Sequence, residues 1–205
     1  PANIRAPALQ NFAQLAQIQQ PAEMTARLAA LRAWTIDEAD RLDAVFMRRK
    51  AAGCIRECHG DLHLGNLALI DGAPVAFDCL EFNAELRWID VISEIAFLMM
   101  DLFDRGSDAL AWGLLNAYLT ETGDYAGIAV LRFYLVYRAL VRAKVALLHA
   151  RQLAAGTATK ATPLPAACAE VCSTMRMNMM SLVFAWALRS AQDSLMDAWC
   201  ARGIQ

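Results

Sequence analysis

The segment HGDLHLGN, residues 59–66, gathers several side chains that could do chemistry. It follows Ile55–Cys58, a short run typical of a strand, and its two glycines and polar residues predict a loop rather than a core element. The loop presents a carboxylate at Asp61 and an amide at Asn66. We therefore interpret it as a segment that holds polar side chains in fixed positions.

A further carboxylate, Asp78, follows a predicted β-hairpin, in which Leu67–Ile70 and Pro74–Phe77 flank a turn of sequence DGA. Because a hairpin returns the chain to its starting end, we expect Asp78 to lie beside Asn66 and close to Asp61. Two carboxylates and an amide oxygen suit a hard cation such as Mg²⁺, which takes one or two protein carboxylates and leaves other positions to substrate phosphates. The remaining carboxylate would then accept a proton from a hydroxyl group.

In this order and spacing, the residues resemble the catalytic loop of the aminoglycoside phosphotransferase and choline kinase families, which have the protein-kinase-like fold. The H-G-D-x-H-x-x-N motif of those families is matched here by His59, Gly60, Asp61, His63 and Asn66. Their metal-binding aspartate is matched by Asp78 in VAFD, and a further aspartate at the start of the next helix is matched by Asp90 in WIDV.

The resemblance implies an ATP- and Mg²⁺-dependent phosphotransferase that acts on a small-molecule hydroxyl group. Asp61 would be the general base or would position the acceptor hydroxyl, and His63 would lie near the transferred phosphate. Asn66 and Asp78 would bind Mg²⁺ bridging the ATP phosphates. His59 would pack under the loop and fix its shape.

Asp90 would support the loop from behind, through its backbone. The longer runs FDCLEFNAELRWIDVISEIAFLMMDL and YRALVRAK resemble a bacterial subgroup that joins a phosphotransferase-like domain to a C-terminal ATP-binding P-loop domain. The resemblance covers roughly residues 20–150 and is densest over 55–105. It implies a mainly α fold with a small β-hairpin, the C-terminal lobe of a kinase-like protein.

The second lobe of such an enzyme has no counterpart in the sequence. There is no glycine-rich G-x-G-x-x-G loop and no G-x-x-x-x-G-K-[ST] motif, and the first lysine, Lys50, lies at the end of a predicted helix, so it cannot be the strand lysine of a kinase. We therefore expect the N-terminal lobe, and a C-terminal P-loop domain, to be partners outside this chain. Apolar surface left exposed without that lobe would favour a homodimer.

Helical periodicity covers most of the remaining sequence. We expect a kinase-like C-lobe over residues 1–155, a linker over 156–165, and a long Met-rich helix within 166–205 that packs on the lobe or on a partner. One predicted helix contains Leu9–Ile18 and a second begins at Pro21. A third begins at the capping box Thr35–Glu38 and ends near Gly53, and a fourth runs from Trp88 to Gly106. Two more start after the cap residues Ser107 and Asp124.

Composition narrows the class of protein. A net charge of −2 gives no footprint for nucleic acid. The most apolar runs are interrupted by charges, so no membrane span is predicted; these charges are Glu94, Asp101, Arg138, Arg142, Lys144 and Arg189. Six cysteines without a secretory signal favour reduced thiols in a cytoplasmic protein.

Two other functions remain open at this stage. A non-catalytic, pseudokinase-like module that binds a partner domain would explain the absent lobe. A two-metal phosphoesterase would explain GDLH, but that chemistry needs several more histidines than the sequence has. Arg138 and Arg142, four residues apart on one helix face, would either steer an anionic substrate or pair with nearby acids.

Overall fold

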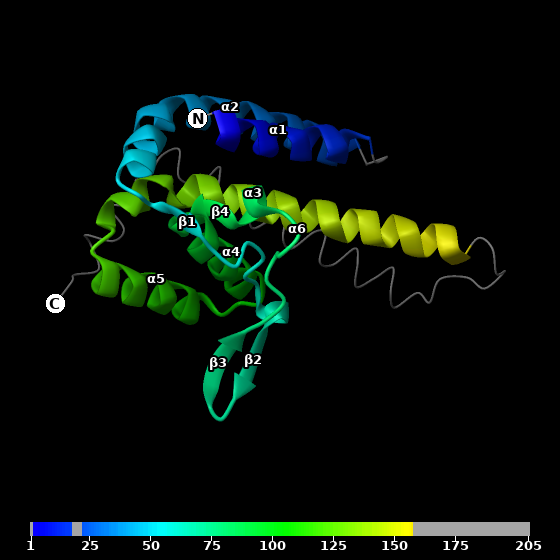
Figure 1. The fold of residues 1–205 in the computed structure, drawn as a ribbon. Helices are drawn as coiled ribbons and strands as arrows, with labels where there is room; N and C mark the ends of the chain where they lie inside the picture. Colours follow the sequence, from blue (N-terminus) through cyan, green and yellow to red (C-terminus); the bar gives the residue numbers. More distant parts are fainter. Residues whose placement is uncertain (1, 18–21, 158–205) are drawn as a thin grey trace.

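The structure is a computed structural model that describes residues 2–17 and 22–157, and in it a helical body carries one projecting hairpin (Figure 1). The long helices are α1 (Ala2–Ala16), α2 (Ala22–Ala51), α4 (Val91–Asp104), α5 (Asp108–Thr122) and α6 (Ile128–Thr157). The short elements are β1 (Ile55–Glu57), the 3₁₀ turn η1 (Leu64–Asn66), β2 (Leu67–Ile70), β3 (Ala73–Ala76), α3 (Ala84–Arg87), β4 (Trp88–Asp90) and the 3₁₀ turn η2 (Tyr125–Gly127). The predicted mainly α fold with a small β element is confirmed.

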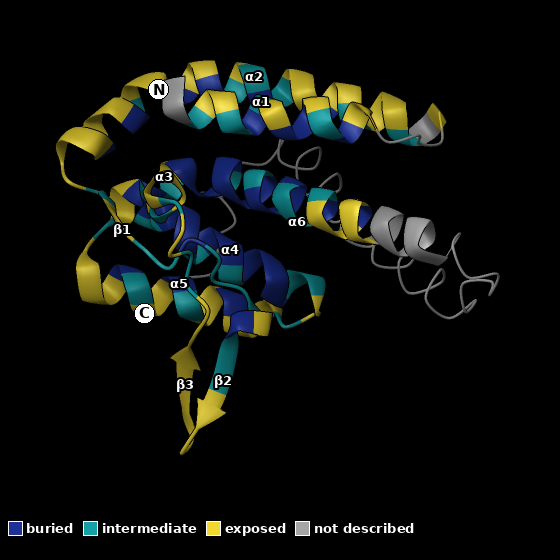
Figure 2. Cartoon of the chain, turned by 45° about the vertical axis from the view of Figure 1, so that its right-hand side comes forward, coloured by how far each residue is buried: buried dark blue, intermediate teal, exposed yellow. Residues whose placement is uncertain are grey.

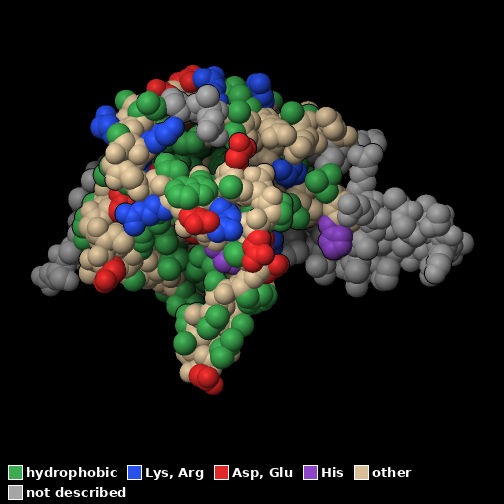
Figure 3. Space-filling view, in the orientation of Figure 1, with side chains coloured by type: hydrophobic (Ala, Val, Ile, Leu, Met, Phe, Trp, Pro, Cys, Tyr) green, Lys and Arg blue, Asp and Glu red, His purple; other side chains and the backbone are tan. Residues whose placement is uncertain are grey.

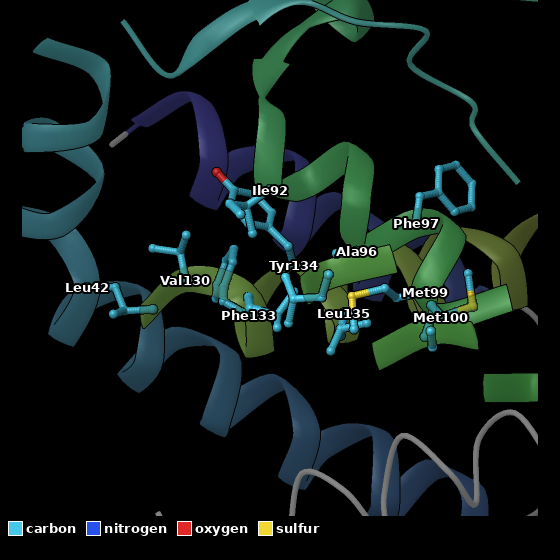
Figure 4. Packing of buried hydrophobic residues seen from close by; sticks show 14 of the residues in the cluster. Leu42, Ile92, Ala96, Phe97, Met99, Met100, Val130, Phe133, Tyr134 and Leu135 are labelled. Atoms are coloured by element: carbon cyan, nitrogen blue, oxygen red, sulfur yellow. The ribbon is translucent and has the colours of Figure 1, made fainter. Parts of the chain in front are cut away.

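The core lies where α4 packs between α5 and α6, with α2 covering α6 from the other side (Figure 2). Large side chains from three helices interlock there, as Figure 4 shows for Leu42, Ile92, Phe97, Met99, Val130 and Phe133. The ring of Phe46 on α2 meets the rings of Phe133 and Tyr134 edge to face, with centroids 5.3 and 5.9 Å away. Removal of this apolar surface from water is the main force that holds α4 in place.

Helix α2 is continuous, so the predicted helix start at the capping box Thr35–Glu38 is wrong. The hydroxyl of Thr35 donates back to the carbonyl of Leu31 at 2.8 Å, one turn earlier, instead of capping a new helix. The predicted end is confirmed: α2 stops at Ala51 after a basic last turn, and Gly53 follows with φ of 75°.

The two small sheets bracket the HGDLHLGN loop. Strand β1 pairs antiparallel with β4, with Ile55 opposite Asp90. The predicted helix start at Trp88 is therefore wrong, because Trp88–Asp90 form strand β4. The helix begins at Val91 because the Asp90 carboxylate accepts from the amide of Ile92 at 3.0 Å. The predicted hairpin is confirmed as β2 and β3. Its two turn residues both have positive φ, as a tight two-residue turn requires.

A buried ion cluster ties three helix ends together. Arg49, at the end of α2, donates two hydrogen bonds to Asp90 at 2.7 and 2.8 Å and two to Asp124 at the same distances. Tyr118 also donates to Asp124, at 2.8 Å. Asp124 was expected to cap the next helix, but its side chain makes no capping bond and serves this cluster instead. Burial alone would raise the pKa of Asp124, yet the bonds from Arg49 and Tyr118 lower it.

Of the predicted linker and C-terminal helix, the structure describes only the beginning of the linker. Helix α6 extends to Thr157, so the first two residues of the predicted linker are helical. The rest of the linker and the predicted Met-rich helix lie outside the described residues. Among the described helices, none combines the length and the apolar character needed to cross a membrane.

Candidate functional site

The HGDLHLGN loop is held by a buried carboxylate from α4. Glu94 accepts the backbone amides of Gly60 and Leu62, at 2.8 and 3.1 Å, one with each carboxylate oxygen. Its exposed fraction is only 6%, so these charge-assisted bonds are shielded from water. Gly60 has φ of 86°, and a Cβ there would lie 2.9 Å from the carbonyl oxygen of Leu86. The start of the loop therefore requires glycine and is fixed by Glu94.

A buried arginine from α6 holds the same loop from its carbonyl side. Arg138 donates to the carbonyl of Gly60 at 3.0 Å and to the carbonyl and hydroxyl oxygens of Ser93 at 3.2 and 3.1 Å. Its guanidinium lies over the ring of Phe97, 4.6 Å from the centroid. Burial lowers the pKa of Arg138, an effect that Glu94 opposes. Arg138 thus joins α6, the start of α4 and the loop.

The second half of the loop is anchored by Asp101, two turns further along α4. Its carboxylate accepts the amide of Leu64 at 2.9 Å, at the start of η1. Asp101 is buried, and Arg105 lies 4.0 Å from the same oxygen. Three buried charges on two apolar helices therefore fix the path of the loop backbone.

Asp61 and Asn66, predicted to lie together, are joined by hydrogen bonds. The side-chain amide of Asn66 donates to the backbone oxygen of Asp61 at 3.0 Å and to its carboxylate at 3.2 Å. This contact uses the nitrogen of the amide and leaves Oδ1 as its acceptor atom. The Asp61 side chain is 36% exposed, so the carboxylate is open to solvent while its backbone is fixed.

His63 is held as a neutral imidazole that faces Asp61. Its Nδ1 accepts the amide of Gly65 at 3.0 Å, which places the ring proton on Nε2, 3.5 Å from the Asp61 carboxylate. The ring packs on Phe97 with centroids 5.7 Å apart. Burial lowers the pKa of His63, and the charge of Arg142 lowers it further, against the opposite effect of Asp61. The neutral form with an Nε2–H donor is therefore favoured.

His59 connects the loop to the segment that leaves the hairpin. Its Nε2 donates to the carbonyl of Phe77 at 2.8 Å, and its carbonyl accepts the amide of Leu80 at 3.1 Å. The amide of Phe77 in turn donates to the carbonyl of Asn66 at 3.0 Å. Asp78 therefore follows directly on a residue bonded to both ends of the loop.

Asp78 itself is exposed and has φ of 60°, an uncommon conformation for a residue other than glycine. Such strained positions persist where the surrounding structure fixes them, and they concentrate at functional sites. Figure 3 shows a histidine and acidic side chains together where the hairpin leaves the body. Asp78 thus lies at the base of the hairpin, next to the loop.

The support expected from Asp90 comes from other residues. The bonds described for Asp90 go to Arg49 and to the first turn of α4, not to the loop backbone. Glu94, Asp101 and Arg138 hold the loop instead, a role that the sequence did not predict for any of them. Their signal in the sequence was a charged residue within an otherwise apolar helical run.

The oxygen atoms at this site suit a hard cation rather than a soft one. Asn66 Oδ1 and the exposed carboxylate of Asp78 are of the type that Mg²⁺ takes in small number. Within residues 2–17 and 22–157, no group of three or more His, Cys, Asp and Glu side chains is arranged as a metal centre. The three cysteines described, Cys54, Cys58 and Cys79, are free and half-buried.

Comparison with known proteins identifies relatives of unknown function. The chain is 44% identical over 103 residues to uncharacterized protein Rv2004c of Mycobacterium tuberculosis strain H37Rv and to uncharacterized protein Mb2027c of Mycobacterium bovis. The match covers 50% of this chain and 21% of either relative, so the chain spans about a fifth of the length of the curated relatives it matches. No family model and no solved structure matches the chain.

Proposed function

We propose that this chain is the catalytic lobe of an ATP- and Mg²⁺-dependent phosphotransferase of the aminoglycoside phosphotransferase and choline kinase type, with an alcohol as acceptor. The observation that carries the proposal is the bonded pair Asp61–Asn66 on a loop whose backbone is fixed by Glu94 and Arg138. A fixed loop with an open carboxylate is what positioning catalysis requires.

Each residue of the loop has a distinct task in this proposal. The Asp61 carboxylate accepts the hydroxyl proton of the acceptor, and its bond from Asn66 keeps it oriented. The Nε2–H of His63 donates to a phosphate oxygen, which its fixed tautomer allows. Asn66 and Asp78 hold Mg²⁺, which neutralises the charge of the ATP phosphates when bound.

The site needs partners to complete it. The nucleotide would lie between this lobe and an N-terminal lobe, which the proposal places outside this chain in the cytoplasmic parent protein. The exposed apolar hairpin supports this, since Leu69 is 76% and Phe77 48% exposed, and a lone two-stranded hairpin is marginal in water. A P-loop domain or a second copy of the chain are further partners in this proposal.

Titration of Mg-ATP into the chain by calorimetry tests the proposal. Asp78→Asn removes the proposed ligand charge, and asparagine tolerates the positive φ of 60°. Asp71→Asn is the matched control, because Asp71 is also an exposed aspartate with positive φ, at the far end of the hairpin. We expect saturable heat that requires Mg²⁺, is lost in Asp78→Asn and persists in Asp71→Asn. Equal heat in both variants would contradict the assignment of Asp78.

The same exposed hairpin also favours a second function, a non-catalytic module that binds a partner domain. The titration separates the two functions. A folded chain that binds its partner but gives no heat with Mg-ATP, alone or in that complex, would favour the module. Heat that depends on Asp78 would favour the phosphotransferase.

A further inference from the structure

Arg142 brings a second guanidinium to the HGDLHLGN loop. It lies on α6 one turn beyond Arg138, which bonds to the carbonyl of Gly60. Residues four apart share one face of a helix, so Arg142 lies on the side of α6 that meets the loop. Its side chain is half-buried, whereas Arg138 is almost fully buried.

Within the described residues, no hydrogen bond or ion pair ends on Arg142. Two of the carboxylates at the loop, Asp61 and Asp101, have other partners. Asp61 is engaged with Asn66 and His63, at 3.2 and 3.5 Å. Asp101 accepts the amide of Leu64 and lies 4.0 Å from Arg105. Arg142 is therefore a half-buried arginine without a hydrogen-bonded or ion-paired partner among the described residues.

Asp104 is the acid that a purely structural explanation would assign to Arg142. Burial and the charge of Asp101 raise the pKa of Asp104. The charges of Arg105 and Arg142 lower it, and Arg142 has the smaller effect of the two. The two side chains form no ion pair in the part of the chain that the structure describes. A through-space effect of this kind leaves the donors of the guanidinium free.

The charge of Arg142 also acts on His63, whose Nε2–H faces Asp61. Helix register places Arg142 on the side of α6 that meets the loop, and its effect on His63 agrees with that placement. A guanidinium fork matches the geometry of carboxylate and phosphate groups. A neutral alcohol offers such donors only a hydroxyl oxygen, whereas an anionic alcohol offers a charged acceptor that binds them more strongly.

We propose that Arg142 binds an oxyanion on the acceptor, a phosphate ester or a carboxylate, so that the substrate class is an anionic alcohol. This assignment rests on the proposed phosphotransferase function. The oxyanion at Arg142 orients the acceptor, and its hydroxyl lies toward Asp61.

The test uses glycerol 3-phosphate, glycerate and glycerol as probes, and NMR of the three histidine rings of the chain as readout. His63 lies beside the site, and His149, exposed near the end of α6, is an internal reference. We expect saturable shifts of the His63 signals with glycerol 3-phosphate or glycerate, none with glycerol, and no change at His149. Shifts with both anions would leave the choice of oxyanion to their relative affinity.

Arg142→Gln should weaken binding of the anionic probe by about tenfold or more, the loss of one charge-assisted contact. Arg105→Gln is the matched control, because Arg105 is a nearby arginine with a 57% exposed side chain, and it should change affinity by about twofold or less. Thermal unfolding verifies that both variants are folded. Unchanged affinity in Arg142→Gln, or an equal loss in Arg105→Gln, overturns the proposal.

Competition with Mg-ATP separates donor from acceptor. An acceptor anion stays bound when Mg-ATP is added, since donor and acceptor must be bound together. Displacement by Mg-ATP would assign Arg142 to the donor phosphates and overturn the acceptor assignment. If calorimetry detects no Mg-ATP binding by the chain, alone or in complex with its N-terminal lobe, while the anion still needs Arg142, the phosphotransferase function and the acceptor assignment fail, whereas the oxyanion site remains.

Discussion

Replacing Glu94 with glutamine should destabilise the protein through the HGDLHLGN loop. The glutamate accepts two backbone amides, from Gly60 and Leu62, and glutamine can accept only one because its other terminal atom is a donor. The remaining bond loses its charge, which removes roughly half its strength. With one charge-assisted bond worth about 1.5–3 kcal/mol lost and a buried N–H left without an acceptor, we expect a net cost of about 2–4 kcal/mol, after allowing for easier burial of a neutral side chain.

Urea unfolding of Glu94→Gln measures that cost, and hydrogen exchange of the Gly60 and Leu62 amides locates it. Glu85→Gln is the matched control, because Glu85 is exposed on α3 and should change the free energy of unfolding by less than about 0.5 kcal/mol. We expect faster exchange at the two loop amides in Glu94→Gln alone. Wild-type stability together with wild-type protection would refute the inference that Glu94 fixes the loop.

Three further predictions follow from buried or strained groups. Arg49→Met should cost about 3–5 kcal/mol in urea unfolding by leaving two carboxylates unpaired, whereas exposed Arg48→Met should cost less than about 0.5 kcal/mol; similar values would contradict the ion cluster. Gly60→Ala should destabilise the protein more than Gly72→Ala. The two glycines have similar positive φ, 86° and 80°, but only a Cβ at Gly60 would meet a backbone oxygen, at 2.9 Å. Burial raises the pKa of Cys58 from 9.0 to about 11, so stability should fall as pH rises through that window, and Cys58→Ala should flatten the fall.

Features set by local chemistry were predicted from the sequence. The hairpin turn needs residues that accept positive φ, and Asp71 and Gly72 supply them. The end of α2 needs a basic last turn and a glycine beyond it, and the sequence has both. Such signals involve neighbours in the chain, so they do not depend on the rest of the fold.

Features set by tertiary contacts were predicted wrongly or not at all. Thr35 and Glu38 have the spacing of a capping box, but packing keeps α2 continuous through them. Trp88 continues the apolar period of α4, but it lies in a strand because β1 pairs with it. Both errors arise because a partner distant in the sequence overrides a local preference.

The candidate site also combines features set by local chemistry with features set by tertiary contacts. Asp61 and Asn66 were expected to converge with Asp78 through the hairpin, and the five residues that separate Asp61 from Asn66 limit the distance between them. The supports of the loop are 32 to 78 residues away in sequence, and each is a single charge on an apolar helix. A charge at such a position is consistent with surface exposure until the burial of the helix is known.

The arrangement makes the loop depend on helices that do not contain it. Backbone bonds within the loop and to Phe77 and Leu80 fix its local shape, whereas the amides of Gly60 and Leu62 bond to Glu94 on α4. Its position on the body depends on how α4 and α6 pack, since Glu94 and Arg138 extend from those helices to the same residue, Gly60. A substitution that shifts α6 against α4 would move Asp61 without touching it, and Arg142, on the same helix as Arg138, would move with it. Loop position and the proposed acceptor site are thus coupled through one helix.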